Sequence, residues 1–344
     1  ITLQEDTETL DEVVVVGYGV QKKSDVTGAM ARVGEKELKA MPVRNALEGM
    51  QGKTAGVDIT SSQRPGEVGN INIRGQRSIN AEQGPLYVVD GMVIQNGGIE
   101  NINPSDIEAI DILKDASATA IYGSRGANGV ILVTTKKGKE GKVTLNYSGT
   151  VTFETLHDVT EMMSAAEWLD YARLAKYNAG SYASATPTYE ADKAAFGSVT
   201  ASWKNIEKAW VNGVYDPSLV GSYDWASHGK QTGITHEHTL SASGGSDKFQ
   251  GYASFGYLDQ KGTQPGQAYE RYTLKTSFDV TPVNWFKMGS SINASYSTQD
   301  YGYSFSKSVT GSGDFYSALR SMIPWTVPYD ENGEYVRYPS GDVN

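Results

Sequence analysis

Residues 142–153 have the sequence KVTLNYSGTVTF, in which apolar or small side chains alternate strictly with polar ones. Successive side chains of a β-strand point to opposite faces, so this period of two predicts a strand with one apolar and one polar face. About eleven residues is the length of a tilted strand that crosses a bilayer. The stretch therefore predicts a membrane-spanning strand of an antiparallel β-barrel.

The same alternation returns toward the C-terminus, which gives about five expected strands in all. Apolar positions recur in residues 249–257, 272–280 and 286–296, and a weaker strand is expected over 235–243. The sequence contains no run of about 18 apolar residues, so it does not encode a membrane-spanning helix. Barrel strands cross a bilayer with a low mean hydropathy, so a membrane protein is still indicated.

The connections between these strands alternate in length. Tight turns are expected at 244–247 and 281–284, and a longer connection at 259–270. Two much longer segments, 156–230 and 301–344, are interpreted as extracellular loops, because outer-membrane barrels have short periplasmic turns and long outer loops. This order of short and long connections fits a first strand that runs outward from a domain on the periplasmic side.

The composition excludes several other classes of protein. The net charge is -10, which argues against a nucleic-acid-binding protein with its basic surface. The chain has 38 Gly and 21 Tyr against 8 Phe, a mixture that suits turn-rich β structure. It has no cysteine, so a disulfide framework and a thiolate metal site are excluded.

Residues 21–140 have a different, α/β-like pattern. Two apolar runs surround Asp90-Gly91, and this dipeptide between apolar runs predicts a β-hairpin. Asp115 is expected to cap a short helix that ends at Gly123. The segment is therefore expected to be a compact α/β domain.

The long connections contain helical signals of their own. Ser164 and Glu167 have the spacing of a capping box directly ahead of Trp168. Trp203 and Trp210 are expected on one face of a second amphipathic helix.

A series of short motifs runs through the first 140 residues. They are DEVVVVGYG at 11–19, VTGA at 26–29, NALEG at 45–49, GKTAGV at 52–57, IRG at 73–75, PLYVVDG at 85–91 and AIYGSRGANGVILVTT at 120–135. In this order they resemble the SusC/RagA type of TonB-dependent outer-membrane transporters. The resemblance is near-continuous over 10–140 and ordered but patchy over 141–340.

This resemblance implies a transmembrane antiparallel β-barrel, partial in this chain, with an α/β plug domain in its lumen; the full-length protein would have about 22 strands. The implied segments are the tail of a preceding small β-sandwich domain at 1–10, a TonB-box segment at 11–20, the plug domain at 21–140 and the first barrel strands at 141–344. The chain is accordingly expected to be cut at both ends.

The resemblance also implies TonB-dependent active import of oligosaccharides or peptides across the bacterial outer membrane, with no enzymatic activity and no cofactor. The implied partners are TonB with its inner-membrane energising complex, a SusD-like surface lipoprotein that lids the barrel, and outer-membrane lipid. A dimer of transporter–lipoprotein pairs is expected, with the plug and the N-terminus on the periplasmic side.

A TonB box works by β-augmentation, in which an extended segment adds a strand to its partner. The residues assigned to TonB binding are Asp11, Glu12, Val13, Val14, Val15, Val16, Gly17 and Tyr18. Valine is strongly β-prone, so the four successive valines suit strand pairing. The alternative is that the segment is an ordinary plug strand.

Two plug motifs, Arg74-Gly75 and Asp90-Gly91, are assigned a gating or structural role. Arg74 is expected to be buried where the plug meets the barrel and to pair with a carboxylate. Removing one partner of such a pair would cost about 3–5 kcal/mol.

Contacts with the substrate or the lipoprotein are expected from two groups of residues. The first group lies in outward-facing plug loops and consists of Ser78, Asn80, Gln83, Gln95 and Asn96. The second group consists of large aromatic residues of the long loops, namely Trp203, Trp210, Tyr223, Trp225 and Trp325. Aromatic rings can stack on sugars or on peptide side chains, and the alternative is that they pack the loops.

Other chemistries fit the sequence less well. His236 and His238 share one face of a strand and could hold a metal, but no third ligand is visible. The glycines of 123–129 match neither nucleotide-binding pattern. Acids such as Asp111 and Asp115 could mimic a glycosidase pair, although acids are common in helix caps.

Two competing classes can be separated from a transporter. A passive binding or adhesion receptor on the same barrel would have no use for a TonB box. A secreted all-β enzyme predicts clustered acids in a cleft and lacks the alternation of tight turns and long loops, which is the reverse of this sequence.

Overall fold

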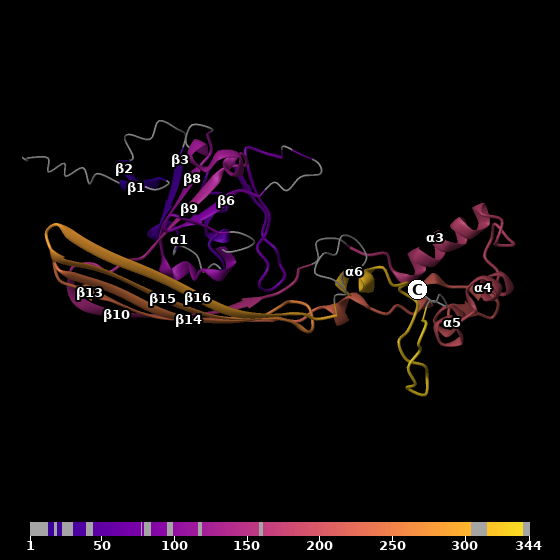
Figure 1. Cartoon of the computed structure of the whole chain (residues 1–344). Helices are drawn as coiled ribbons and strands as arrows, with labels where there is room; N and C mark the ends of the chain where they lie inside the picture. Colours follow the sequence, from indigo (N-terminus) through magenta and orange to yellow (C-terminus); the bar gives the residue numbers. More distant parts are fainter. Residues whose placement is uncertain are drawn as a thin grey trace, which may run out of the picture. The chain divides into compact units, whose positions relative to one another are not determined.

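The computed structural model describes residues 13–16, 19–22, 30–38, 44–76, 78, 84–94, 99–115, 119–157, 161–303 and 315–339. The chain separates into two compact units, each of which is treated by itself below (Figure 1). Unit 1 comprises 1–154, 233–262 and 267–300, and unit 2 comprises 155–232, 263–266 and 301–344.

Unit 1 contains a five-stranded sheet, here called the wall, that forms a long curved layer in Figure 1. Its strands are β10 (Gly141–Glu154), β13 (Gly233–Gly245), β14 (Phe249–Lys261), β15 (Gln267–Val283) and β16 (Phe286–Tyr301). They lie in chain order, and the registers of the first four strands are antiparallel. The five expected strands are therefore confirmed.

The wall strands are longer than the sequence pattern predicts. The expected long connection at 259–270 is wrong, because β14 continues to Lys261 and β15 begins at Gln267. Asp259 pairs with Glu270 across these two strands. The apolar alternation ends near Tyr257 and Tyr272, whereas backbone pairing does not require apolar side chains and continues beyond them.

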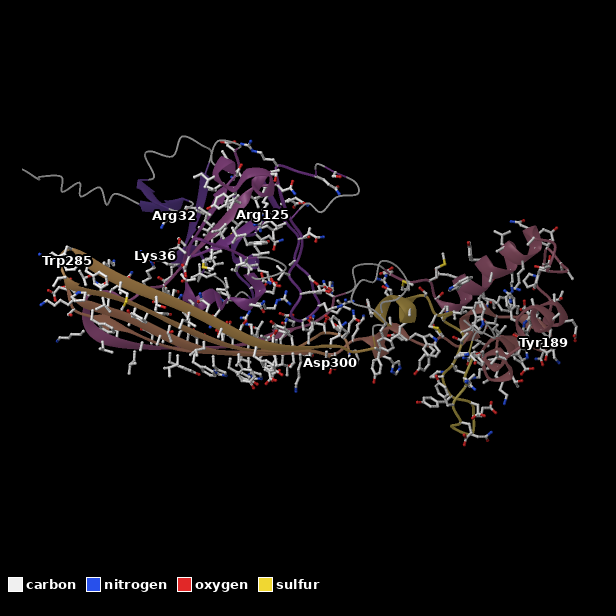
Figure 2. All side chains as sticks on the ribbon, viewed as in Figure 1. Arg32, Lys36, Arg125, Tyr189, Trp285 and Asp300 are labelled. Carbon is white, nitrogen blue, oxygen red and sulfur yellow. The ribbon has the colours of Figure 1, made fainter. Side chains whose placement is uncertain are left out.

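The wall carries its polar side chains on the buried face. On β15 the buried residues are Arg271, Thr273, Lys275 and Ser277, and the exposed ones include Tyr272, Leu274 and Phe278. A sheet of a water-soluble protein buries its apolar face instead. Trp285, at the turn before β16, is 86% exposed and lies at the opposite end of that strand from Asp300 (Figure 2). The arrangement is that of a barrel wall with lipid outside and a polar lumen.

The plug domain of unit 1 is built on a second five-stranded sheet with the order β3-β8-β9-β6-β7. The strands are β3 (Met30–Gly34), β6 (Leu86–Val89), β7 (Met92–Ile94), β8 (Ile107–Leu113) and β9 (Val130–Thr135). β6 and β9 are parallel, and the other neighbours are antiparallel. An α/β plug is thus confirmed within the described residues.

Shorter elements surround this sheet. They are α1 (Glu35–Leu38), the pair β4 (Val57–Ile59) and β5 (Ile71–Ile73), and the 3-10 helices at Glu48–Met50, Ile99–Asn101, Pro104–Asp106 and Ala120–Gly126. The helix expected between Asp115 and Gly123 lies partly outside the described residues, and its part from Ala120 onward is a 3-10 helix. Gly123 interrupts it with φ 59° and ψ -145°, a conformation that only glycine adopts readily.

The core of the plug lies on the central strands β8 and β9. Ile110, Ile112 and Ile131 are completely buried there. Both strands are rich in β-branched residues, which fit a pleated surface covered on both faces. Burial of these side chains holds the plug together as one body.

The segment that leaves the plug runs directly against the wall. A Cβ atom added at Gly138 would lie 2.2 Å from the backbone nitrogen of Gly251 on β14. Two backbones therefore meet here without a side chain between them, which only glycine permits at position 138.

Unit 2 contains the helices α3 (Ala165–Asn178), α4 (Tyr189–Phe196), α5 (Thr200–Glu207) and α6 (Phe315–Arg320) and a small hairpin of β11 (Trp210–Val211) with β12 (Val214–Tyr215). None of the helices in the described residues is long and apolar enough to cross a bilayer. Further 3-10 turns cover Pro217–Leu219 and Ala226–Gly229.

In unit 2 the helix α3 begins as expected, whereas α5 ends earlier than expected. The capping box is confirmed, since the Ser164 hydroxyl accepts a hydrogen bond from the backbone of Glu167 and the Glu167 carboxylate accepts one from Ser164. The second helix contains Trp203 but stops before Trp210, which begins the hairpin. Asn212 and Gly213 adopt positive φ at the turn of this hairpin. An Asn-Gly pair favours such a turn, and this preference overrides the helical spacing of the tryptophans.

A buried ion pair lies inside unit 2. Arg173 Nε donates to Asp192 Oδ1 at 2.9 Å, and a second guanidinium nitrogen bonds the other carboxylate oxygen. Tyr182 and Trp210 also donate to this carboxylate, at 2.7 and 3.0 Å. Although burial acts to lower the pKa of Arg173, the hydrogen bonds and charge of Asp192 outweigh it and raise that pKa above its ordinary value.

Candidate functional site

The predicted TonB-binding segment forms a strand in the structure. β1 (Val13–Val16) pairs antiparallel with β2 (Gly19–Lys22) in a two-stranded sheet. Within the described residues β1 has no neighbour on its other edge, where a further strand could pair. Four residues assigned to the same segment, Asp11, Glu12, Gly17 and Tyr18, lie outside the described part of the chain.

The Asp90-Gly91 hairpin turn is confirmed, with φ of 48° and 86° at the two residues. Asn, Asp and Gly are the residues that tolerate positive φ at both positions of such a turn. The Asp90 carboxylate accepts a hydrogen bond from the backbone nitrogen of Thr135 at 2.9 Å and another from the Thr135 hydroxyl. The turn is thereby tied to the end of β9.

Lys275 of the wall reaches the same carboxylate. Its Nζ lies 3.7 Å from Asp90 Oδ2, and its side chain is only 3% exposed. The ammonium also donates to the Thr135 hydroxyl, to Ser291 Oγ at 3.3 Å and to Asn293 Oδ1 at 3.2 Å. One cluster therefore joins the β6–β7 turn, the end of β9 and the wall strands β15 and β16.

A second set of contacts comes from the turn before β8. Asp106 accepts a hydrogen bond from the Tyr252 hydroxyl at 2.8 Å. Asn103 uses its carbonyl oxygen to cap the 3-10 turn and donates from its amide nitrogen to Thr239 Oγ1 at 2.9 Å. The two bonds fix this turn to the wall strands β14 and β13.

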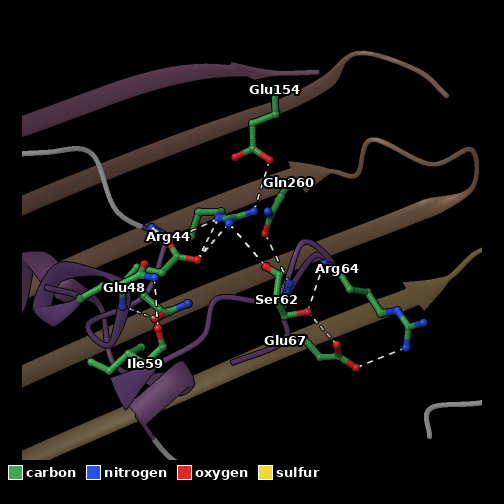
Figure 3. A network of polar contacts seen from close by, with 11 residues as sticks. Arg44, Glu48, Ile59, Ser62, Arg64, Glu67, Glu154 and Gln260 are labelled. Atoms are coloured by element: carbon green, nitrogen blue, oxygen red, sulfur yellow. Dashed lines mark hydrogen bonds and ion pairs between the residues drawn. The ribbon is translucent and has the colours of Figure 1, made fainter. Parts of the chain in front are cut away.

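Arg44 forms a third contact with the wall (Figure 3). Its guanidinium lies 3.2 Å from Glu154 at the end of β10 and 2.9 Å from Glu48 of the plug. A cavity of about 150 Å³ lies beside these groups and is lined also by Glu237 of β13. Arg44, Glu48 and Glu154 are paired and partly exposed, so water can replace their protein partners.

These bonds, here called the plug–wall contacts, are the pairs Asp90–Lys275, Asp106–Tyr252, Asn103–Thr239 and Arg44–Glu154. All of them are polar. A typical hydrogen bond contributes only about 0.5–1.5 kcal/mol net, because water can replace either partner. Each of these four contacts can therefore be exchanged for contacts with water.

The expected position of Arg74 is wrong. Its side chain is 47% exposed and forms an ion pair with Asp115, a residue of the plug itself. Arg74 and Gly75 both have positive φ, at 60° and 82°, so the chain turns sharply after β5 and directs the arginine away from the core. Pairing with a carboxylate is confirmed, but burial against the wall is not.

Three of the aromatic residues expected to contact substrate are packing residues. Trp203 and Trp325 are each 5% exposed and belong to the core of unit 2. Trp210 donates to the buried Asp192 and packs against Tyr189. The alternative of internal loop packing therefore holds for these three.

The remaining aromatic candidates occupy a different environment. Tyr223 and Trp225 are partly exposed, pack edge to face at 5.0 Å, and line a cavity. Among the plug-loop candidates Ser78 is partly buried, and the others lie outside the described residues. Those others are Asn80, Gln83, Gln95 and Asn96.

Three of the residues considered for metal binding or glycoside hydrolysis, His238, Asp111 and Asp115, lie near other side chains of the protein. His238 Nδ1 lies 2.8 Å from the Tyr147 hydroxyl, and the two rings stack on the outer face of the wall. In the part of the chain that the structure describes, no group of three or more His, Cys, Asp or Glu side chains is placed to hold a metal. Asp111 lies 3.9 Å from Arg32, and Asp115 pairs with Arg74.

A plug sheet held by polar contacts against the lumen face of an apolar-out wall defines the class of TonB-dependent outer-membrane receptors. Residues 22–130 match the family TonB-dependent Receptor Plug Domain. The chain is 36% identical to TonB-dependent receptor P39 of Formosa agariphila, covering 98% of this chain and 29% of that protein. It is 32% identical to TonB-dependent receptor SusC of Bacteroides thetaiotaomicron, covering 97% and 31%.

The structure resembles the RagAB peptide importer in its open-open state with a TM-score of 0.73 and 31% identity. That match covers 94% of this chain and 36% of the solved chain. The chain belongs to the SusC/RagA type of TonB-dependent transporters. It spans about 30% of the length of the curated relatives that it matches.

Proposed function

We propose that the protein imports oligosaccharides or peptides across the bacterial outer membrane, with energy supplied through TonB. The observation that carries this proposal is the set of polar plug–wall contacts, in a chain whose strand β1 has no neighbour on its other edge within the described residues. A plug that must move needs an attachment that can be released, and a TonB box needs a strand that can pair.

In this proposal TonB pairs with residues 11–18 and pulls on the plug. The pull reaches the β6–β7 turn, where Asp90 and Gly91 act as the gating element. Breaking the contact of Asp90 with Lys275 frees the turn from β15 and β16. The Arg74–Asp115 pair lies within the plug, so we assign Arg74 and Gly75 a structural role.

The proposed organisation follows from the same assignment. Residues 1–10 end a preceding domain, 11–20 hold the TonB box, 21–140 form the plug and 141–344 begin the barrel. The segments 156–230 and 301–344 lie on the cell surface, where a SusD-like lipoprotein covers the barrel. The plug faces the periplasm, the barrel lies in outer-membrane lipid, and two transporter–lipoprotein pairs form a dimer.

Deletion of residues 11–18 in the full-length protein tests the proposal. Cells carrying the deletion should bind substrate at the surface but lose uptake, measured with labelled oligosaccharides and peptides. A matched control deletes Asn332 and Gly333, which lie at an exposed turn held by Asp330. Undiminished uptake after the first deletion would contradict TonB-dependent import by this protein and leave the passive binding or adhesion receptor as the alternative.

A further inference from the structure

Unit 2 contains a cavity of about 330 Å³, here called the methionine cavity. Its walls come from the start of α3, from residues 222–226 and from residues 319–324. Its apolar lining includes Met162, Met163, Trp168, Trp225, Leu319 and Met322. The volume lies in the range of sites that hold small ligands or single side chains.

The polar groups at the cavity are engaged with protein partners. The Tyr223 hydroxyl lies 2.7 Å from His228 Nε2. Trp225 Nε1 donates to Thr326 Oγ1 at 3.1 Å. Asp224 caps the turn that follows it by accepting from a backbone nitrogen at 3.1 Å. Each of these groups therefore already has a protein partner.

Two more polar side chains are engaged in the same way. Ser164 belongs to the capping box of α3. Arg320 donates to Met162 Sδ at 3.3 Å and lies over the ring of Tyr316. Ser222 adds a single further hydroxyl to the lining. What the cavity offers a ligand is mainly carbon and sulfur surface.

This surface distinguishes the two substrate classes. A sugar ring carries hydroxyls around its edge, and burying them without hydrogen-bond partners is unfavourable. An apolar side chain has no such requirement. Methionine is flexible and polarisable, so it adapts to apolar groups of different shape. Met162 and Met163 are each 55% exposed, which opens the cavity to an incoming chain.

We propose that the methionine cavity binds an apolar amino-acid side chain of a peptide substrate. This rests on the proposed import function and selects peptides over oligosaccharides. The aromatic faces of Tyr223 and Trp225 contact the bound side chain, while their polar atoms keep their present partners.

The test measures binding to the purified full-length protein by calorimetry. The probes are a decapeptide with one central Phe, the same decapeptide with Ser in its place, and maltoheptaose. The Phe peptide should bind about 10- to 100-fold more tightly than the Ser peptide, the effect expected for burial of one large apolar side chain. Equal binding of the two peptides, or binding of maltoheptaose alone, overturns the proposal.

A variant locates the effect. Met162→Asp with Met163→Asp places two charges at the cavity mouth, on exposed positions that leave the core of unit 2 intact. It should remove the preference for Phe. The matched control Val214→Asp lies on the hairpin of the same unit, is 70% exposed and should keep the preference. Unchanged preference in the double variant overturns the assignment to this cavity.

The import proposal is tested separately from the cavity. Deletion of residues 11–18 should abolish uptake of the Phe peptide by cells and leave its calorimetric binding unchanged. Uptake that survives this deletion contradicts TonB-dependent import, whereas loss of the Phe preference in the control variant contradicts only the cavity assignment.

Discussion

Two buried ion pairs in this molecule each join one basic side chain to one aspartate, but their geometry differs. Arg173 and Asp192 lie inside unit 2, where a planar guanidinium makes two bonds to a carboxylate that is 0% exposed. Lys275 and Asp90 join the wall to the plug at 3.7 Å, with hydroxyls around the ammonium. Arginine forms a rigid fork, whereas lysine is a point charge on a flexible stem. The first pair suits permanent structure and the second suits release.

The largest expected effect comes from breaking the pair in unit 2. Arg173→Met leaves Asp192 buried without its cation, so unit 2 should lose about 3–5 kcal/mol of its free energy of unfolding. Hydrogen exchange of the α3 and α4 amides in the full-length protein measures this loss. The control Lys204→Met removes an exposed ion pair with Glu331 and should cost at most about 1 kcal/mol.

A smaller effect is expected for the pair between plug and wall. Lys275→Met leaves Asp90 with its two bonds from Thr135, so the loss should be about 1–3 kcal/mol and should appear as faster exchange of the β6 and β9 amides. Adding Asp90→Asn should recover part of it, because both charges are then gone.

The control for that experiment is Lys287→Met, which removes a largely exposed lysine 3.9 Å from Asp279 on the wall. This variant should leave the hydrogen exchange of the plug amides unchanged. A Lys275→Met protein whose plug amides exchange at the original rate would show that this pair does not hold the plug.

A single plug–wall hydrogen bond should contribute less again. Tyr252→Phe removes the hydroxyl that donates to Asp106 and should weaken plug attachment by about 0.5–1.5 kcal/mol. Tyr296→Phe is the matched control, because Tyr296 lies on the same sheet and is 66% exposed. If the plug amides exchange hydrogen at the same rate in both variants, the Asp106 contact does not help to attach the plug to the wall.

The smallest effect is a pH dependence of the stability of unit 2. Burial, followed by the hydrogen bond and charge of Asp192, raises the pKa of Tyr182 to about 12. The folded state thus favours the neutral phenol of Tyr182. Its contribution to the free energy of unfolding is complete below pH 10 and is lost as the pH rises toward about 12. Unit 2 should therefore show a decline in stability over this window, and Tyr182→Phe should reduce that decline.

The strands of the wall could be predicted from the sequence because the pattern that indicates a strand lies within a few consecutive residues. Strict alternation over residues 142–153 is enough to indicate a strand, and the Asp90-Gly91 turn requires only two residues of special conformation. The motifs shared with a known family predicted the plug. Such features depend on neighbours in the chain, so a single sequence reveals them.

Positions that depend on distant neighbours were less predictable. Arg74 belongs to a clear motif, yet its exposure depends on the positive φ of its own backbone. Trp203 and Trp325 are aromatic residues of long loops, and only their meeting in one core shows that they pack rather than bind. The sequence places Lys275 on a polar strand face but does not indicate its partner, 185 positions away (275 minus 90).

The meeting of Gly138 with the backbone of Gly251 has a mechanical consequence. A flexible linker with larger side chains would hold the two backbones further apart. A force applied to the plug would then first extend this linker. Here the exit from the plug lies directly against the backbone of β14. If the plug moves as proposed, we expect this contact to be the point about which it moves.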